Sequence, residues 1–269
     1  MTVFSLADAD WLARHRTAAD LIIVDVRPAS DYWAGHLAGA RHLDAGVLAI
    51  PSTDAAAVAR FQALLVQLLS GLGIVAQSRV LVVGAAGEVN ISRVAWALGY
   101  AGVQQVLLLD GGLAGLPAPA LVHEAPAVTA TRFALRPVSA WLASAEQVQQ
   151  LGAGALVDAR KRVEFLGERS NARRNGRIPG ARHWDTRQEV DVAGRFRPLA
   201  ELVQGFAVLA TPDQRLVAYC GGGGRAARTF IALQLAGHQD TAVYPASWSE
   251  WGNRDDLPVE SGEPAATAA

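Results

Sequence analysis

Short runs of apolar residues recur along the chain and alternate with longer amphipathic stretches. The runs "LIIVDV", "VLVVG", "VLLLD", "ALVDA" and "LVAYC" begin at residues 21, 80, 106, 155 and 216. Runs this short that are apolar throughout are typical of strands buried on both faces of a parallel sheet. Segments such as "DAAAVARFQALLVQLLSGLG" lie between them and predict helices that cover the sheet. The pattern therefore predicts an α/β protein.

The chain contains an internal duplication. The segment "LIIVDVRPASDYWAGHLAGARHLD" from residue 21 pairs with "ALVDARKRVEFLG" from 155 and "GRIPGARHWD" from 176, and the second copy carries a short basic insertion. The match resumes between residues 78–112 and 214–247, where Gly84 aligns with Cys220. A repeat of this kind indicates two units of the same fold.

A stretch rich in proline and alanine separates the two copies. It shows neither helical nor alternating periodicity, which is typical of an extended linker. The length of 269 residues is enough for two domains. We expect a first domain over residues 1–116, a linker over 117–134, a second domain over 135–258 and a disordered tail over 259–269.

Composition and charge exclude several classes of protein. With 51% hydrophobic and 18% charged residues, the chain belongs with folded proteins and not with disordered ones. A formal net charge of -1 predicts no broad attraction to nucleic acid or to anionic membranes. The sequence shows neither a secretory leader nor a run of about 18 apolar residues. We therefore expect a cytoplasmic protein that does not enter membranes.

Cys220 is the only cysteine, so neither an intramolecular disulfide nor a cysteine-rich zinc site can form. Its thiol is either a small buried apolar group or a reagent. The residues that follow it decide between these alternatives. They are Gly221, Gly222, Gly223, Gly224 and Arg225.

The glycine run lies between a predicted strand, "RLVAYC", and a predicted helix, "RAARTFIALQLAG". Each ordered glycine costs about 0.5 to 1 kcal/mol relative to alanine, so four together indicate a loop with unusual torsions. A flexible linker is the alternative, but no polar spacer flanks the run. A tight turn at a helix N-terminus points several N–H groups inward and stabilises a thiolate or a bound oxyanion. We therefore interpret Cys220 as a nucleophile in an anion cradle.

Four segments together resemble the rhodanese (sulfurtransferase) family, in its form with two domains. They are "VDVRPASDYWAGHLAGA", "VDARKRVEFLG" with "GRIPGA", "YCGGGGRAA" and "SWSEWG". The resemblance covers almost the whole chain. It implies two tandem rhodanese-like domains, each a parallel β-sheet flanked by helices on both faces. It also implies that the second domain is catalytic, because Gly84 leaves the first copy without a nucleophile.

The resemblance implies a double-displacement reaction. Cys220 would attack the sulfane sulfur of thiosulfate, form a persulfide, release sulfite and pass the sulfur to a thiol or to cyanide. The amides of residues 221–224 and the side chain of Arg225 would hold the donor. We expect no metal, no organic cofactor and a monomer. The related phosphatases have the longer loop C-x5-R, so the spacing C-x4-R favours sulfur over phosphorus.

Two positions depart from the mercaptopyruvate-type members of the family. These members carry an arginine where this chain has Glu164 and a serine where it has Gly222. The departures favour thiosulfate as the donor over 3-mercaptopyruvate. A sulfurtransferase that uses 3-mercaptopyruvate, a non-catalytic binding module, and an arsenate or phosphate-ester enzyme remain as alternatives.

Other chemically notable residues are expected to be structural. Asp25 with Arg27, and Asp158 with Arg160, are interpreted as ion pairs at strand ends. His36, replaced by Arg177 in the second copy, is expected to form structural hydrogen bonds. Trp248 and Trp251 are expected to pack in the core or between the domains, and the role of Ser247 is left open. Four arginines are expected at the solvated surface, unless one reaches the pocket. They are Arg173, Arg174, Arg177 and Arg182.

Overall fold

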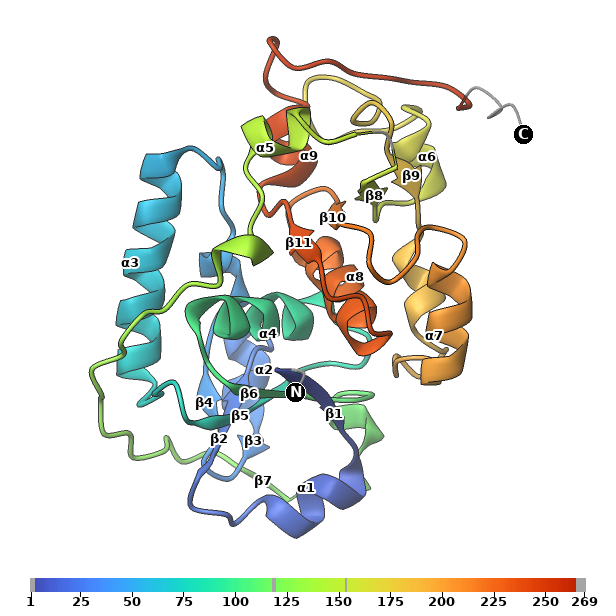
Figure 1. The fold of residues 1–269 in the computed structure, drawn as a ribbon. Helices are drawn as coiled ribbons and strands as arrows, with labels where there is room; N and C mark the ends of the chain where they lie inside the picture. The colour runs from blue at the N-terminus through green and yellow to red at the C-terminus, as the bar shows by residue number, and fades with distance from the viewer. Residues whose placement is uncertain (1–2, 118–119, 153, 265–269) are drawn as a thin grey trace.

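The computed structural model describes residues 3–117, 120–152 and 154–264, which form two α/β domains joined by an extended segment (Figure 1). The first domain and the segment that follows it contain β1 (Phe4–Ala7), α1 (Ala9–His15), β2 (Leu21–Asp25), α2 (Ala29–Ala34), β3 (His36–Leu37), β4 (Arg41–His42), η1 (Ala45–Leu48), α3 (Ala55–Gly71), β5 (Arg79–Val83), α4 (Val89–Ala101), β6 (Gln105–Leu109), η2 (Leu113–Gly115) and β7 (Leu121–Val122).

The second domain has a similar order of elements, most of which are shorter. It contains η3 (Ser139–Trp141), α5 (Ala145–Gln149), β8 (Leu156–Asp158), α6 (Arg162–Phe165), β9 (Arg182–His183), η4 (Thr186–Glu189), α7 (Leu199–Phe206), β10 (Leu216–Tyr219), α8 (Gly224–Leu235), β11 (Thr241–Val243) and α9 (Ser247–Trp251). The first sheet has the order β1-β6-β5-β2-β4 and the second β11-β10-β8-β9, and all pairs in both are parallel. The expected fold is therefore confirmed.

Helices cover both faces of each sheet, as the unbroken apolar runs predict. In the first domain, Leu12 of α1 and Tyr32 of α2 pack on one face, and α3 and α4 pack on the other. In the second, Val148 of α5 and Trp251 of α9 pack on one face, and Phe206 of α7 packs with α8 on the other. A strand between two helical layers has no solvated side, which explains the absence of polar alternation.

Helices α4 and α8 pack against each other between the two sheets (Figure 1). Almost every residue of α4 from Ile91 to its end is buried. The largest apolar cluster runs through this contact, from Val82 of the first sheet to Ala218 and Phe230 of the second domain. The two domains thus share one core, and the loops that precede α4 and α8 lie close to the interface.

The predicted linker and the predicted tail both contact the domains that precede them. In the predicted linker, Leu121 and Val122 pair with β3, and Phe133 is buried. Residues 118 and 119 lie outside the described residues. The prediction of a disordered tail is wrong for residues 259–264, because Glu260 forms a bridge with Arg177 and the N–H of Gly262 donates to a carbonyl. Residues 265–269 of that tail lie outside the described residues.

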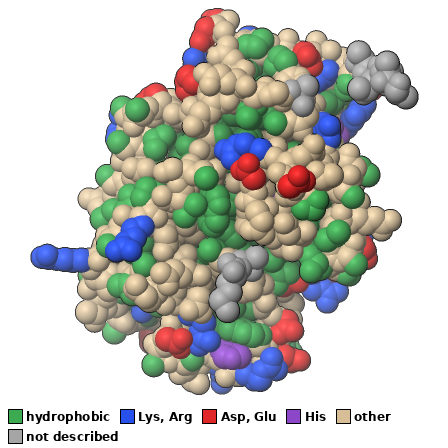
Figure 2. All heavy atoms as spheres, viewed as in Figure 1, with side chains coloured by type: hydrophobic (Ala, Val, Ile, Leu, Met, Phe, Trp, Pro, Cys, Tyr) green, Lys and Arg blue, Asp and Glu red, His purple; other side chains and the backbone are tan. Residues whose placement is uncertain are grey.

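The surface agrees with the low net charge. On the face drawn in Figure 2, basic and acidic side chains are interspersed and neither sign forms a continuous patch. Within the described part of the chain, no helix has both the length and the apolar character that crossing a bilayer requires.

Candidate active site

Cys220 opens the loop that connects strand β10 to helix α8. The strand ends at Tyr219 and the helix begins at Gly224. Gly223 precedes the helix with φ of 91°, in the left-handed region that favours glycine. A Cβ atom there would lie 2.6 Å from the carbonyl oxygen of Pro245. The loop conformation therefore requires glycine at this position.

The thiol of Cys220 lies inside this turn. The residue is only 2% exposed, and the N–H of Gly223 donates to Sγ at 3.2 Å. The N-terminal end of helix α8 also faces this region, since its first residue is Gly224. Both features favour negative charge at the sulfur position. The predicted cradle thus has one N–H group directed at the sulfur.

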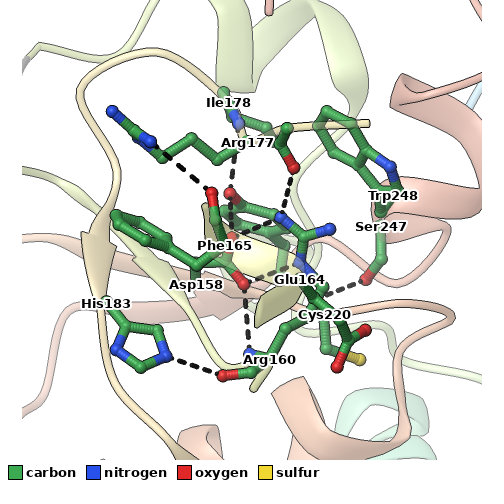
Figure 3. Close-up of polar contacts among 12 residues, drawn as sticks. Asp158, Arg160, Glu164, Phe165, Arg177, Ile178, His183, Cys220, Ser247 and Trp248 are labelled. Carbon is green, nitrogen blue, oxygen red and sulfur yellow. Dashed lines mark hydrogen bonds and ion pairs between the residues drawn. The ribbon is translucent and has the colours of Figure 1, made fainter. Parts of the chain in front are cut away.

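Ser247, whose role the sequence left open, holds the start of the loop through a hydrogen bond to the backbone of Cys220. Its Oγ accepts a hydrogen bond from the N–H of Cys220 at 3.0 Å (Figure 3). The same hydroxyl donates to the carbonyl of Tyr244 at 2.7 Å. The residue has φ of 55°, a conformation that costs a non-glycine residue about 1 to 3 kcal/mol. The N–H of Trp248 also donates to the carbonyl of Cys220. The segment "SWSEWG" therefore holds the cysteine backbone in place.

Arg225 is paired with a carboxylate. Its Nη1 and Nη2 lie 2.7 and 2.9 Å from the two carboxylate oxygens of Glu164, in a bidentate pair. Burial acts to raise the pKa of Glu164, but the hydrogen bonds and charge of Arg225 lower it below its usual value. The pair sits over the loop, because a Cβ on Gly221 would lie 3.2 Å from Nη2 of Arg225. The charge of Arg225 is thus largely compensated by Glu164.

A cavity of about 300 Å³ adjoins the loop. Its wall includes Gly221 and Gly222 of the loop, the Glu164–Arg225 pair, Ser170 and Trp248. These side chains are mostly polar and can hold a small polar molecule next to the turn. Among the residues that the structure describes, no group of three or more His, Cys, Asp and Glu side chains could hold a metal ion.

The Asp158–Arg160 ion pair is buried, and Arg160 belongs to the wall of the cavity (Figure 3). Arg160 donates to the two oxygens of Asp158 at 2.9 and 2.6 Å, and Tyr219 also donates to this carboxylate at 2.6 Å. The guanidinium stacks on Trp248, with Cζ 4.7 Å from the ring centre. Each charged group has its partner, which is the geometry of the structural ion pair predicted from the sequence. The corresponding Arg27 pairs with its own aspartate in the first domain.

The motif histidine and its replacement both have structural surroundings. His36 is buried, stacks on Tyr32 at 4.0 Å, and bonds to two backbone carbonyls. Arg177, its counterpart, stacks on Phe165 at 4.6 Å and donates to the carbonyl of Gly262. The structural role expected for His36 agrees with these contacts.

The four arginines expected at the surface do not line the cavity, and only two of them are exposed. Arg173 and Arg182 are exposed, as predicted. The prediction is wrong for Arg177, which is 3% exposed, and for half-buried Arg174, which donates to the carbonyls of Trp251 and Leu257. Both side chains donate hydrogen bonds to backbone carbonyls.

The corresponding loop of the first domain runs from Gly84 to Glu88, between β5 and α4. Glu88 aligns with Gly224 of the second loop. Its carboxylate turns back into the loop and accepts a hydrogen bond from the N–H of Ala85 at 3.2 Å. The first loop therefore contains a carboxylate where the second loop has no side chain.

A turn of the second domain covers this first loop. Gly194 packs against Gly87, and the N–H of Phe196 donates to the carboxylate of Asp110 at 2.8 Å. The space left between them is about 20 Å³. The first copy of the loop is thus closed as well as lacking a cysteine.

One residue near Cys220 was missed by the sequence analysis. Arg93, in α4 of the first domain, donates from Nη2 to the carbonyl of Gly222 at 2.8 Å. Nothing in the sequence could have pointed to it, because it lies in the copy without a nucleophile and far from the glycine run. Only the packing of α4 against α8 brings it to the loop.

Comparison with known proteins agrees with the expected family. The model of the rhodanese-like domain matches twice, at residues 8–117 and 142–254. The chain is 31% identical to a protein named thiosulfate sulfurtransferase from Pseudomonas aeruginosa, over 97% of this chain and 100% of that protein. It is 29% identical to 3-mercaptopyruvate sulfurtransferase from Escherichia coli, over 94% of this chain and 96% of that protein.

Solved structures show the same fold. The anaerobic ergothioneine biosynthesis enzyme from Chlorobium limicola, solved with trimethyl histidine, matches with a TM-score of 0.84. The match has 23% identity and covers 96% of this chain and 70% of that one. Two matches to one family model, together with relatives named as sulfurtransferases over nearly the full length, place this chain in the rhodanese family as a member with two rhodanese-like domains.

Proposed function

We propose that this protein transfers a sulfane sulfur from thiosulfate to a thiol or to cyanide through a persulfide on Cys220. The observation that carries the proposal is the N–H of Gly223 directed at Sγ, in a turn that adjoins a polar cavity. The only cysteine of the chain occupies this point. The relatives named as sulfurtransferases support the reaction class.

The reaction balances in two displacements. In the first, the Cys220 thiolate attacks the outer sulfur of thiosulfate, the S–S bond breaks, and sulfite leaves with the electron pair. In the second, the acceptor attacks the terminal sulfur of the persulfide, and the Cys220 thiolate is the leaving group. Negative charge is present on sulfur throughout, so the N–H of Gly223 and the N-terminal end of α8 stabilise each stage.

The cavity wall favours thiosulfate over 3-mercaptopyruvate. A carboxylate-bearing donor is best held by an unpaired guanidinium. Here Arg225 is already paired with Glu164, at 2.7 and 2.9 Å. The oxygens of thiosulfate can instead be held by the loop amides and the N-terminal end of α8.

Intact-protein mass spectrometry tests the proposal directly. After mixing with thiosulfate, the wild-type protein is expected to gain one sulfur atom and to lose it when cyanide is added. Cys220→Ser is the control and should gain nothing. A gain with 3-mercaptopyruvate alone would replace the proposed donor. No gain with either donor would favour a binding module.

A further inference from the structure

Arg93 lies at the contact between the two domains, in the second turn of α4. Besides donating to the carbonyl of Gly222, its guanidinium packs against the start of α8. A Cβ on Gly224 would lie 3.1 Å from Nη2 of Arg93 and 3.5 Å from Nε. The side chain of a first-domain residue thus forms the underside of the second-domain loop.

The charge of Arg93 has no carboxylate partner among the residues that the structure describes. Its Nε is buried and makes no hydrogen bond within that same part of the chain. Burial acts to lower the pKa of this guanidinium, and an ionised Cys220 would oppose that effect. A thiolate at Cys220 would therefore act as a counter-ion for Arg93.

The other arginines around the loop are compensated. Arg225 is paired with Glu164, and Arg160 is paired with Asp158. Two arginines of this kind contribute little net charge to the cavity. Arg93 differs because its hydrogen-bond partner is a neutral carbonyl.

The second domain makes a matching contact with the loop of the first domain, through an arginine that also has a carboxyl partner. Arg228 of α8 donates to the carbonyl of Gly87, in the loop of the first domain, at 3.0 Å. However, Nε of Arg228 also bonds to the buried carboxylate of Glu189 at 3.1 Å. Each domain therefore contributes an arginine that bonds to the other domain's loop, and of these two arginines only Arg228 also bonds to a carboxyl group.

We propose that Arg93 of the first domain is a positioning residue for the active-site loop, and that it supplies the positive charge that stabilises anionic sulfur at Cys220. The Gly222 carbonyl and the Gly223 N–H belong to one planar peptide group. By holding the carbonyl, Arg93 therefore fixes the direction of the N–H that points at Sγ. Its role toward the thiolate stands without any donor. Its role toward a persulfide rests on the proposed function.

Alkylation of Cys220 by iodoacetamide tests this inference without a sulfur donor. Because the chain has one cysteine, the mass of the intact protein reports that residue alone. Arg93→Met removes the charge and fills the space with apolar atoms, Arg93→Gln keeps a hydrogen-bond donor without charge, and Arg93→Lys keeps the charge. The exposed Arg60 of α3 provides the control, Arg60→Gln.

We expect Arg93→Met and Arg93→Gln each to slow alkylation about tenfold at pH 7, as a loss of one charge near the sulfur predicts. Arg93→Lys should stay within about threefold of the wild type. The deficit should shrink as the pH rises toward 9, and melting temperatures should show that the variants fold. Two uncharged variants are used so that either one suffices if the other does not fold.

A rate unchanged in the folded uncharged variants would overturn the inference, as would a loss equal at every pH or equal in Arg60→Gln. These outcomes are distinct from failure of the proposed function. If the wild type alkylates as expected but gains no sulfur from thiosulfate, the role of Arg93 stands and the donor is wrong.

Discussion

The two copies of the strand–loop–helix unit have the same order of elements but differ in the groups that lie inside the loop. In the second copy, a thiol lies inside the loop beside a cavity of about 300 Å³. In the first copy, Gly84 replaces the cysteine, the carboxylate of Glu88 bonds to a loop N–H, and the space left is about 20 Å³. An anion cradle can therefore be kept open for a ligand or satisfied by the chain's own carboxylate.

The comparison also shows that the first domain is not an inert copy. Helices α4 and α8 occupy matching places in the repeat and pack together. Arg93 and Arg228 each cross this contact to a loop carbonyl of the other domain. The first domain thus contacts the loop of the second domain that contains Cys220.

The largest expected effect comes from adding a methyl group to a glycine of the second loop, with the matching glycine of the first loop as the control. Gly223→Ala would direct Cβ at the Pro245 carbonyl, 2.6 Å away, in a loop that must hold the sulfur. We expect sulfur transfer to fall about 100-fold or more, because displacements of about 1 Å have such effects. Steady-state assay with thiosulfate and cyanide measures it.

Gly87→Ala is the matched control in the first loop. Gly87 has φ of 67°, and an added Cβ would lie 3.3 Å from Gly194. This variant should lose about 1 to 2 kcal/mol of unfolding free energy and keep most of its activity. Equal losses of activity in the two variants would mean that the loops are not functionally different.

The second prediction concerns how protein stability depends on pH through the carboxyl partner of Arg228. Burial raises the pKa of Glu189, the partner of Arg228, to about 7. Between about pH 5 and 7 the folded protein then holds a proton that the unfolded chain has released, so stability falls as the pH rises through this window. We expect a decrease of about 1 to 3 kcal/mol in the free energy of unfolding.

Urea unfolding at pH 5 and pH 8 measures this dependence. Glu189→Gln cannot titrate and should show a smaller difference between the two pH values than the wild type. The same difference in both proteins would mean that Glu189 stays ionised in the folded state through its contact with Arg228.

The smallest expected effect concerns the compensated arginine of the open loop. Glu164→Gln removes the negative charge from the pair with Arg225, so an anionic donor meets a freer guanidinium. We expect KM for thiosulfate to fall about threefold to tenfold, with a smaller change in kcat. A KM that rises instead would show that the pair positions Arg225 for the donor.

The apolar pattern and the glycine run predicted those parts of the structure that depend on local sequence. The five apolar runs became β2, β5, β6, β8 and β10, and the glycine run became the turn before α8. Strand β11 (Thr241–Val243) was not predicted, because it begins with a polar threonine and has only two apolar residues within its bounds.

The contacts that define the site were not predictable in the same way. The Glu164–Arg225 pair joins side chains 61 positions apart, and the contact of Arg93 with Gly222 spans 129 positions. Such contacts depend on how the helices pack, and neither residue type nor spacing indicates them. The same reason explains the ordered segment at residues 259–264, which is held by a bridge to Arg177.

The shared core has a consequence for any attempt to divide the protein. A fragment with only the second domain would expose the apolar residues of α8, including Phe230 and Ile231, that now pack in the cluster common to both domains. It would also lose the Ser52–Thr53 segment, whose N–H and hydroxyl groups bind the buried carboxylate of Glu250. Exposed patches of this kind promote aggregation. Expression of the second domain alone should therefore yield insoluble protein, even though every residue of the loop at Cys220 is present.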